Sequence, residues 1–228
     1  MVDLSVSPVA GRVVAVVPVK NLGRAKGRLA PALAPAQRRE LVLAMLADVL
    51  GALRAARAVG TLGGYAVISR DAEVLAYAAA QGATPLHDRA EDLNDALAQA
   101  ASHYARRGAA GLLVLPADVP LVAPAEIARL AKAAPAPGIA VAPSRDGGTN
   151  ALLVRPPMAL PFLFGVGSLA RHLDAARARG LPATVFHAAG LSLDVDSPDD
   201  LALLADSPGD TAAQRAVRGM CVMRNCDA

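Results

Sequence analysis

The feature that most constrains the fold is a regular alternation between buried-strand patterns and helical patterns. Residues 13–19 read Val-Val-Ala-Val-Val-Pro-Val, a continuous apolar run rich in β-branched side chains. Such a run is typical of a strand that is buried on both faces, as in a parallel sheet. Pro35 then begins a long helical pattern, in which apolar side chains recur at three- and four-residue spacing from Val42 to Leu53. The start of the chain therefore predicts a buried strand and a covering helix.

The alternation continues through most of the chain. We expect further strands at residues 65–69, 84–86, 111–115, 139–142, 150–154 and 184–186, further helices at residues 71–81, 93–107, 124–134 and 168–179, and a final short helix after residues 191–194. Strand and helix in regular succession imply right-handed crossovers, a mostly parallel sheet and helices on both of its faces. The prediction is a three-layer α/β/α fold.

The length of 228 residues suits one large α/β domain better than two small ones. We assign residues 12–205 to that single domain. After residue 205 the sequence turns polar and irregular, and we expect residues 206–228 to form a loose tail. Cys221 and Cys226 both lie there, without a second Cys or His cluster that would complete a zinc site.

The composition disfavours several classes of partner. Trp is absent and Phe and Tyr number three each, so platforms for stacking single-stranded nucleic acid are scarce. The formal charge of +3 comes from Lys and Arg scattered among Asp and Glu, which suits a small anionic ligand better than a nucleic acid. The first residues lack the basic region of a signal peptide, and the run at residues 13–19 is too short to cross a bilayer. We therefore expect a cytoplasmic protein without a membrane or nucleic-acid partner.

A cationic, glycine-bearing loop follows the first strand. Lys20, Arg24, Lys26 and Arg28 lie within nine residues of one another. Charge alone fits a solvated surface loop equally well, but ligands of parallel sheets bind at the carboxyl ends of the strands, where this loop begins. The loop has neither the Walker pattern nor the dinucleotide fingerprint. Its position favours a cradle for a triphosphate, built from lysine point charges and a planar arginine fork.

Three aspartates are candidate ligands of Mg²⁺. Asp118 follows an apolar strand, with a proline two positions away on either side, and we expect it in an extended segment. The alternative for Asp118 is a local turn. In an extended chain, Asp194 and Asp196 project to the same side. Ser197 with Asp200 has the pattern of a helix N-cap, so Asp196 is not needed to cap the following helix. Carboxylate oxygens at strand ends suit a hard cation.

Two further loops carry polar groups. A turn ending in Gly147-Gly148 delivers the Thr149 hydroxyl to the start of a strand, and two glycines precede a helix at Ser168. A glycine-rich loop before a helix offers free N–H groups to a phosphate or carboxylate, whereas capping by Ser168 is the plain structural alternative. We assign no catalytic role to His172, one turn into that helix.

These motifs together resemble the 2-phospholactate guanylyltransferase family, which serves coenzyme F420 biosynthesis. They follow the family's order from about residue 13 to residue 205, and the set is specific although no single member is. The matching stretches are Val17-Pro18-Val19-Lys20, Ala25-Lys26-Gly27-Arg28-Leu29, Leu93-Asn94-Asp95-Ala96-Leu97, Pro116-Ala117-Asp118-Val119-Pro120-Leu121, Gly148-Thr149-Asn150-Ala151-Leu152, Phe164-Gly165-Val166-Gly167-Ser168 and Asp194-Val195-Asp196-Ser197-Pro198-Asp199-Asp200-Leu201. Gly27 and Val166 depart from the family pattern, which more often has Ser and Pro there.

The resemblance implies a fold like that of nucleotide-diphospho-sugar transferases and molybdenum-cofactor guanylyltransferases. It implies that GTP condenses with 2-phospho-L-lactate, phosphoenolpyruvate or 3-phosphoglycerate, that pyrophosphate leaves, and that the product passes to the next enzyme of the pathway. The implied residue roles are Mg²⁺ ligation by Asp118, Asp194 and Asp196; GTP contacts by Pro18, Val19, Lys20, Lys26, Arg28 and Asn94; acceptor contacts by Thr149, Gly165 and Ser168; and catalysis by Lys20, Lys26, Arg28 and Asp118.

Two alternatives stay open at this point. A sugar-phosphate or molybdopterin nucleotidyltransferase would share the fold, but those proteins usually carry Leu-x-Gly-Gly-x-Gly-x-Arg after the first strand, where this chain has Val17-Pro18-Val19-Lys20. A nucleotide-binding module without turnover would share the cleft. The absence of a Ser-His-Asp or Cys-His arrangement in the sequence agrees with phosphoryl chemistry that needs no covalent enzyme intermediate. The sequence leaves the oligomeric state open, a homodimer included.

Overall fold

Seven strands form one sheet in the computed structural model, which describes residues 9–20, 22 and 26–224, with side chains up to residue 220. Their order across the sheet is β3-β2-β1-β4-β6-β5-β7, and β6 alone runs antiparallel to its neighbours. The mostly parallel sheet is therefore confirmed. The strands are β1 (Val13–Pro18), β2 (Gly64–Ser69), β3 (Thr84–His87), β4 (Gly111–Val114), β5 (Gly138–Pro143), β6 (Thr149–Arg155) and β7 (Ala183–Val185).

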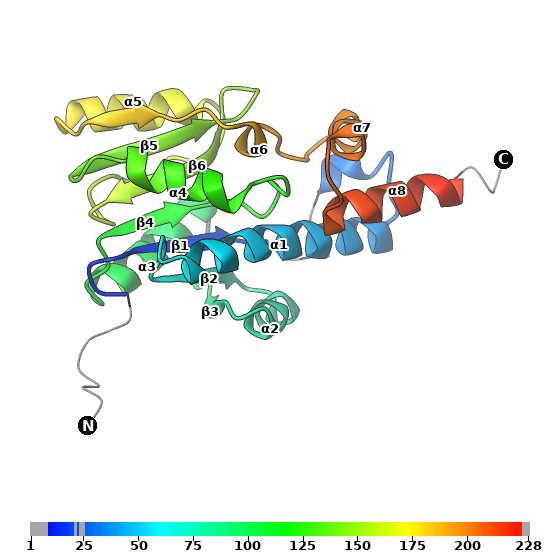
Figure 1. The fold of residues 1–228 in the computed structure, drawn as a ribbon, viewed down its shortest axis with the longest axis horizontal. Coiled ribbons are helices and arrows are strands. Elements are labelled where there is room, and N and C mark those ends of the chain that lie inside the picture. The colour runs from blue at the N-terminus through cyan, green and yellow to red at the C-terminus, as the bar shows by residue number, and fades with distance from the viewer. Residues whose placement is uncertain (1–8, 21, 23–25, 225–228) are drawn as a thin grey trace.

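Helices cover both faces of this sheet, as Figure 1 shows for α1 and α4 in front of it and α3 behind it. The predicted three-layer arrangement is confirmed. Among the described helices, none combines the length and the apolarity needed to cross a membrane. The helices are α1 (Pro35–Ala58), α2 (Ala72–Ala80), α3 (Leu93–Ala105), α4 (Pro124–Ala133), α5 (Ser168–Ala178), α6 (Ala189–Ser192), α7 (Pro198–Asp206) and α8 (Ala212–Arg224), with a 3-10 turn at Gly27–Leu29.

Strand β1 divides the hydrophobic core into two halves. Val13, Ala15 and Val17 pack with α1 and α4 on one face, whereas Val14 and Val16 pack with α3 on the other. All five side chains are buried. Full burial of one valine contributes on the order of 1.5–3 kcal/mol. The central position of β1 explains why its sequence is apolar without alternation, and it fixes the loop that leaves its carboxyl end.

The antiparallel direction of β6 decides which residues share an edge with that loop. β5 and β6 pair as neighbours, and the turn between them returns the chain at residues 144–148. The first residues of β6, Thr149 and Asn150, therefore lie at the edge where the parallel strands β1, β4 and β5 end. Polar side chains from the start of one strand and from the ends of several others can meet there.

The expectation of an irregular tail is wrong for residues 212–224, which form helix α8 beside α1 (Figure 1). The Asp48 carboxylate of α1 accepts hydrogen bonds from the N–H groups of Ala212 and Ala213, both at 2.8 Å. Gln214 is fully buried and donates to the carbonyl oxygens of Leu204 and Ser207. Thr211 and Gln214 form a local capping box at the start of α8, whereas the Asp48 contact joins residues 164 positions apart, which a local sequence pattern cannot reveal. Cys221 lies in α8, and Cys226 lies outside the described residues.

We expect Asp48→Ala to destabilise the protein by about 1–2 kcal/mol, because two helix N–H groups and a favourable dipole contact lose their partner. Urea unfolding of the full chain measures this difference. Glu40→Ala is the matched control, since Glu40 is an exposed carboxylate on the same helix. An Asp48→Ala protein as stable as Glu40→Ala would contradict the docking role of Asp48.

Candidate active site

A cleft of about 850 Å³ lies at the carboxyl edge of the parallel strands. It is lined by residues that follow β1, β2, β3, β4 and β5 and by the first residues of β6. The structure brings together every predicted site residue except Asn94. Those lining residues are Pro18, Val19, Lys20, Lys26, Arg28, Asp118, Thr149, Gly165, Ser168, Asp194 and Asp196.

The cationic loop is held to the sheet by backbone contacts. The Val19 N–H donates to the Ile68 carbonyl at 3.0 Å, and the Leu22 N–H donates to the Asp71 carboxylate at 3.0 Å. Lys20 and Arg28 are exposed at the cleft. Arg24, predicted in the same loop, lies outside the described residues. The loop thus presents exposed cations from an anchored backbone.

Lys26 lies between two carboxylates. Its ammonium is 2.7 Å from Asp118 Oδ2 and 2.5 Å from Asp196 Oδ1, and its side chain is 11% exposed. Burial alone would lower the pKa of Lys26, but the charges of Asp118 and Asp196 raise it above its ordinary value. Lys26 has a φ of 52°, in the left-handed region that residues other than glycine rarely adopt. The backbone strain at Lys26 accompanies its placement between the two acids.

Asp118 lies in a turn and not in the extended segment that its flanking prolines predicted. Residues 117 and 118 form this turn, which begins three residues after the last residue of β4. The Asp118 carbonyl accepts the N–H of Val195 at 3.0 Å, which joins the turn to the second acidic segment. Val195 is fully buried, whereas Asp194 and Asp196 on either side of it line the cleft. The expectation that these two acids face the same side is confirmed.

The acidic segment is fixed by the start of α7. Ser197 caps this helix, as predicted, with its side chain accepting from the Asp200 N–H. Asp200 accepts the N–H groups of Asp196 at 3.0 Å and Ser197 at 2.8 Å, and it pairs with Arg145 from the β5–β6 turn. Asp200 therefore ties the acidic segment before α7 to the β5–β6 turn.

The three acids have the donor chemistry of a divalent-cation site. Burial raises the pKa of Asp194, the charges of Asp118 and Asp196 add to the rise, and a hydrogen bond from Asn150 opposes it. Within the described ranges, no three acidic, His or Cys side chains are drawn together tightly enough to hold a metal ion. The oxygens of Asp118 and Asp196 nevertheless converge on one cation, the Lys26 ammonium. Carboxylate oxygens around a cation position suit a hard divalent metal ion.

The opposite wall carries a buried polar cluster. Ser168 begins α5, but Gly167 is the N-cap residue and Ser168 makes no cap, so the capping alternative for Ser168 is wrong. Its hydroxyl instead donates to Thr149 Oγ1 at 3.0 Å. His172 is fully buried, with Nδ1 3.2 Å from Thr149 Oγ1, and its Nε2 accepts the Leu163 N–H at 3.0 Å. Burial, aided by the charge of Arg171, lowers the pKa of His172 to about 4.

Asn94 lies behind the cleft wall and does not line it. Its Oδ1 accepts the Phe164 N–H at 2.8 Å, and its Nδ2 donates to the Phe164 carbonyl at 3.3 Å. Both ends of the amide are therefore used on the segment before the Gly165-Val166-Gly167 loop. The structure gives Asn94 a positioning contact, and nucleotide contact by Asn94 remains a prediction.

Several cleft residues were missed by the sequence analysis. Arg70, directly after β2, pairs with Asp88, directly after β3, at 3.5 Å. Ser144 and Asp146 lie in the segment between β5 and β6, where hydrogen bonds from the Ser144 hydroxyl and the Gly148 N–H lower the pKa of Asp146. The rule that ligands meet the carboxyl ends of parallel strands, applied to every strand, would have found Arg70 and Asp88.

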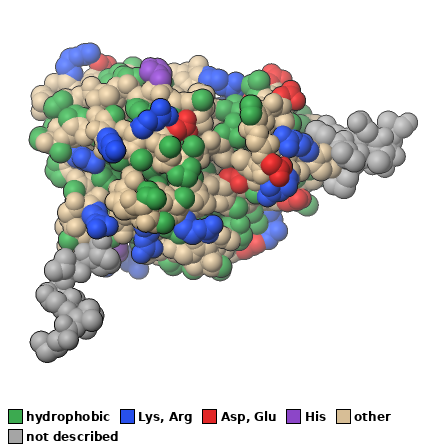
Figure 2. Space-filling model, in the orientation of Figure 1, with side chains coloured by type: hydrophobic (Ala, Val, Ile, Leu, Met, Phe, Trp, Pro, Cys, Tyr) green, Lys and Arg blue, Asp and Glu red, His purple; other side chains and the backbone are tan. Residues whose placement is uncertain are grey.

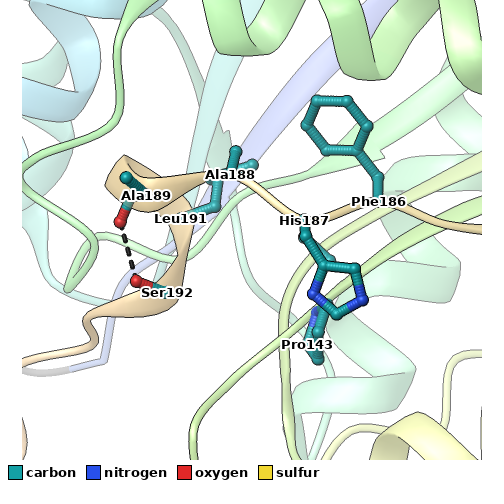
Figure 3. A pocket seen from close by; sticks show the side chains of 8 residues that line it. Pro143, Phe186, His187, Ala188, Ala189, Leu191 and Ser192 are labelled. Atoms are coloured by element: carbon teal, nitrogen blue, oxygen red, sulfur yellow. Dashed lines mark hydrogen bonds between the residues drawn. The ribbon is translucent and has the colours of Figure 1, made fainter.

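A second hollow of about 340 Å³ shares no residue with the cleft (Figure 3). It is lined by the end of β5 and by residues 186–192, among them Phe186 and His187. The Ser192 hydroxyl donates to the Ala189 carbonyl at 2.7 Å, so this polar group is already satisfied. None of the predicted site residues lies there.

The molecular face in Figure 2 intersperses Lys and Arg with Asp and Glu. No broad area of one sign covers that face.

The lowered pKa of His172 makes stability depend on pH. The unfolded imidazole, with a pKa of 6.5, binds a proton before the folded one, whose pKa is about 4, so stability falls as pH falls through this window. Between pH 7 and pH 5 we expect the wild type to lose about 2 kcal/mol more than His172→Gln, measured by urea unfolding. Equal losses in both proteins would contradict a neutral, buried His172.

The family follows from comparison with known proteins. The family model described as "Guanylyl transferase CofC like" matches residues 13–222. A phosphoenolpyruvate guanylyltransferase of Sphaerobacter thermophilus is 48% identical over 193 residues, which are 84% of this chain and 92% of that protein. A 2-phospho-L-lactate guanylyltransferase of Methanothermobacter thermautotrophicus is 40% identical over 188 residues, 82% of this chain and 81% of that protein.

The fold has a counterpart among solved structures. A chain from Desulfovibrio desulfuricans G20, assigned to the nucleotide-diphospho-sugar transferases, superposes with a TM-score of 0.77 at 15% identity. The match covers 94% of this chain and 97% of that one, which confirms the expected fold type. Fold, family model and relatives agree with the motif set in the sequence. The chain belongs to the CofC-like family of guanylyl transferases.

Proposed function

We propose that the protein transfers the GMP part of GTP to the phosphate of a short phospho-acid and releases pyrophosphate, as a step of coenzyme F420 biosynthesis. The observation that carries this proposal is the arrangement of Lys26 between Asp118 and Asp196 in a cleft whose other wall presents hydroxyl groups. Cations for a triphosphate, oxygens for a metal ion and donors for an anionic acceptor thus share one space.

Phosphoenolpyruvate is the acceptor we favour. Relatives that are 45–48% identical to this chain are named phosphoenolpyruvate guanylyltransferases, whereas a relative named for 2-phospho-L-lactate is 40% identical. Both acids carry a phosphate and a carboxylate on a three-carbon skeleton. Thr149, Ser168 and Gly165 line the cleft, and their hydroxyl and backbone N–H groups would hold these anionic groups.

The nucleotide belongs on the β1 side of the cleft. Pro18 and Val19 line its floor, and Lys20, Lys26 and Arg28 supply positive charge for the triphosphate. Arginine can grip two phosphate oxygens at once, and lysine acts as a point charge. These cations stabilise the charge that grows on the departing pyrophosphate.

Asp118, Asp194 and Asp196 would hold the metal ion, which we propose to be Mg²⁺. When bound, such an ion neutralises phosphate oxygens and aligns the reacting groups. The transfer step itself needs no covalent bond to the protein.

An acceptor phosphate oxygen attacks the α-phosphorus, the bond from the α-phosphorus to its bridging oxygen breaks, and pyrophosphate takes the electron pair. Because the attacking oxygen is already anionic at neutral pH, no general base is needed.

Asp196→Asn keeps the shape of the side chain and removes its charge. We expect the rate of pyrophosphate release from GTP and phosphoenolpyruvate to fall at least about 100-fold, because the proposed metal site loses one of its three carboxylate ligands. Asp199→Asn is the matched control in the same acidic run, since Asp199 is exposed and does not line the cleft. Its rate should stay within about twofold of wild type. Equal rates in the two variants would refute the metal assignment.

Lys26→Met keeps the length of the side chain and removes the ammonium. We expect kcat/KM for GTP to fall about 100-fold, because the triphosphate loses a cation and the two acids face each other without neutralisation. Lys132→Met, at an exposed position on α4, controls for loss of one positive charge. A Lys26→Met enzyme with unchanged kcat/KM for GTP would show that Lys26 has only a structural role.

A further inference from the structure

His172 is a buried polar residue that the proposed chemistry does not use. It is fully buried in α5, and its ring contacts the Phe164 ring edge-on at 5.1 Å between centroids. Both ring nitrogens have partners within hydrogen-bond distance: Nε2 the Leu163 N–H, and Nδ1 the Thr149 hydroxyl. Thr149 and Ser168 line the cleft, so the ring stands directly behind the wall assigned to the acceptor.

The Leu163 contact fixes which nitrogen carries the proton. A backbone N–H can only donate, so Nε2 has to be the unprotonated nitrogen. A neutral imidazole then carries its proton on Nδ1, and this proton points to Thr149 Oγ1. Protonation of Nε2 would cost the ring its contact with Leu163, and burial already disfavours the charged form.

A count of protons shows what this tautomer does to the two hydroxyl groups. His172 Nδ1, Thr149 and Ser168 together hold three protons, and the contacts among them use two. Ser168 donates to Thr149, so the Thr149 proton is left over. If the Thr149–Ser168 bond is reversed, the Ser168 proton is left over. In either case one hydroxyl proton remains for a group in the cleft. With the other tautomer, Thr149 would donate to His172 and Ser168 to Thr149, and none would remain.

We propose that His172 is a positioning residue that makes the Thr149–Ser168 hydroxyl pair a hydrogen-bond donor toward the anionic acceptor, an assignment that rests on the proposed function. A carboxylate or phosphate can only accept, so a wall that donates favours it. The same wall with the other tautomer would present lone pairs and repel the anion. His172 thus sets the polarity of the acceptor subsite without touching the acceptor.

The tautomer can be measured without any substrate. In a long-range ¹H–¹⁵N spectrum of the uniformly ¹⁵N-labelled full chain at pH 7, we expect His172 Nδ1 in the protonated range and Nε2 in the unprotonated range. His172→Gln identifies the resonances by their loss. A protonated Nε2, whether in the opposite tautomer or in the imidazolium, would overturn the proposal. Because no turnover is involved, this result stands even if pyrophosphate release from GTP and phosphoenolpyruvate is never observed, an outcome that refutes the proposed function alone.

Steady-state kinetics test the consequence for the acceptor. His172→Gln can still accept from Leu163 but cannot place a donor at the Nδ1 position, and we expect it to raise KM for phosphoenolpyruvate about tenfold while KM for GTP stays within about twofold. His172→Asn places its amide N–H near the Nδ1 position and should recover most of the loss. His187→Gln, at an exposed histidine of the second hollow, is the matched control.

Two results would overturn the positioning role. One is an equal rise of both KM values in His172→Gln, which indicates general loosening of the cleft. The other is a His172→Asn enzyme as impaired as His172→Gln, since a shared defect would follow from the lost ring and not from the lost donor. Thermal unfolding of each variant shows whether the protein is folded at the assay temperature, and the spectrum of the wild type decides the question if neither variant folds.

Discussion

The contact of the Lys26 ammonium with Asp118 and Asp196 is the interaction on which the rest of the site depends. It joins the loop after β1, the turn after β4 and the segment before α7. Asp118 lies 92 positions after Lys26 in the sequence, and Asp196 lies 170 positions after it. Without a cation, two carboxylates at one cleft would repel each other. With it, the acids are held together before any ligand arrives, and the strained backbone of Lys26 is retained. The cleft is therefore preorganised by charge.

The antiparallel strand β6 supplies the second wall. In an all-parallel sheet, the start of a strand lies at the edge opposite the carboxyl ends of its neighbours. Because β6 runs the other way, Thr149 and Asn150 begin at the edge where β1 and β4 end. Asn150 then bonds Asp194, and Thr149 meets Ser168 and His172. One reversed strand thus brings the hydroxyl pair and the acids into the same cleft.

Local patterns predicted much of this fold, and most of what they missed depends on contacts distant in sequence. Short patterns of neighbouring residues were sufficient to predict the buried strand β1, the helix that starts at Pro35 and the cap at Ser197. The Asp48 carboxylate docks the start of α8 from 164 positions away, and the contacts of Asn94 go to Phe164, 70 positions away, so neither contact was visible in a local window. The local capping box of α8, Thr211 with Gln214, was overlooked. The sequence analysis assigned His172 no role, because a single histidine in a helix of polar and apolar residues gives no indication that its side chain is buried. The sequence was sufficient to predict that the site residues lie in one cleft, but it did not reveal which residue each of them contacts.

The most direct test of the central claim is the product itself. Purified protein is incubated with Mg²⁺ and each of four nucleoside triphosphates, crossed with phosphoenolpyruvate, 2-phospho-L-lactate and 3-phosphoglycerate, and the products are identified by mass spectrometry. We predict a guanosine product in which GMP is joined through a diphosphate bridge to one of these acids, formed in equal amount with pyrophosphate. GTP left unchanged by all three acids, or hydrolysed without a joined product, would contradict the account.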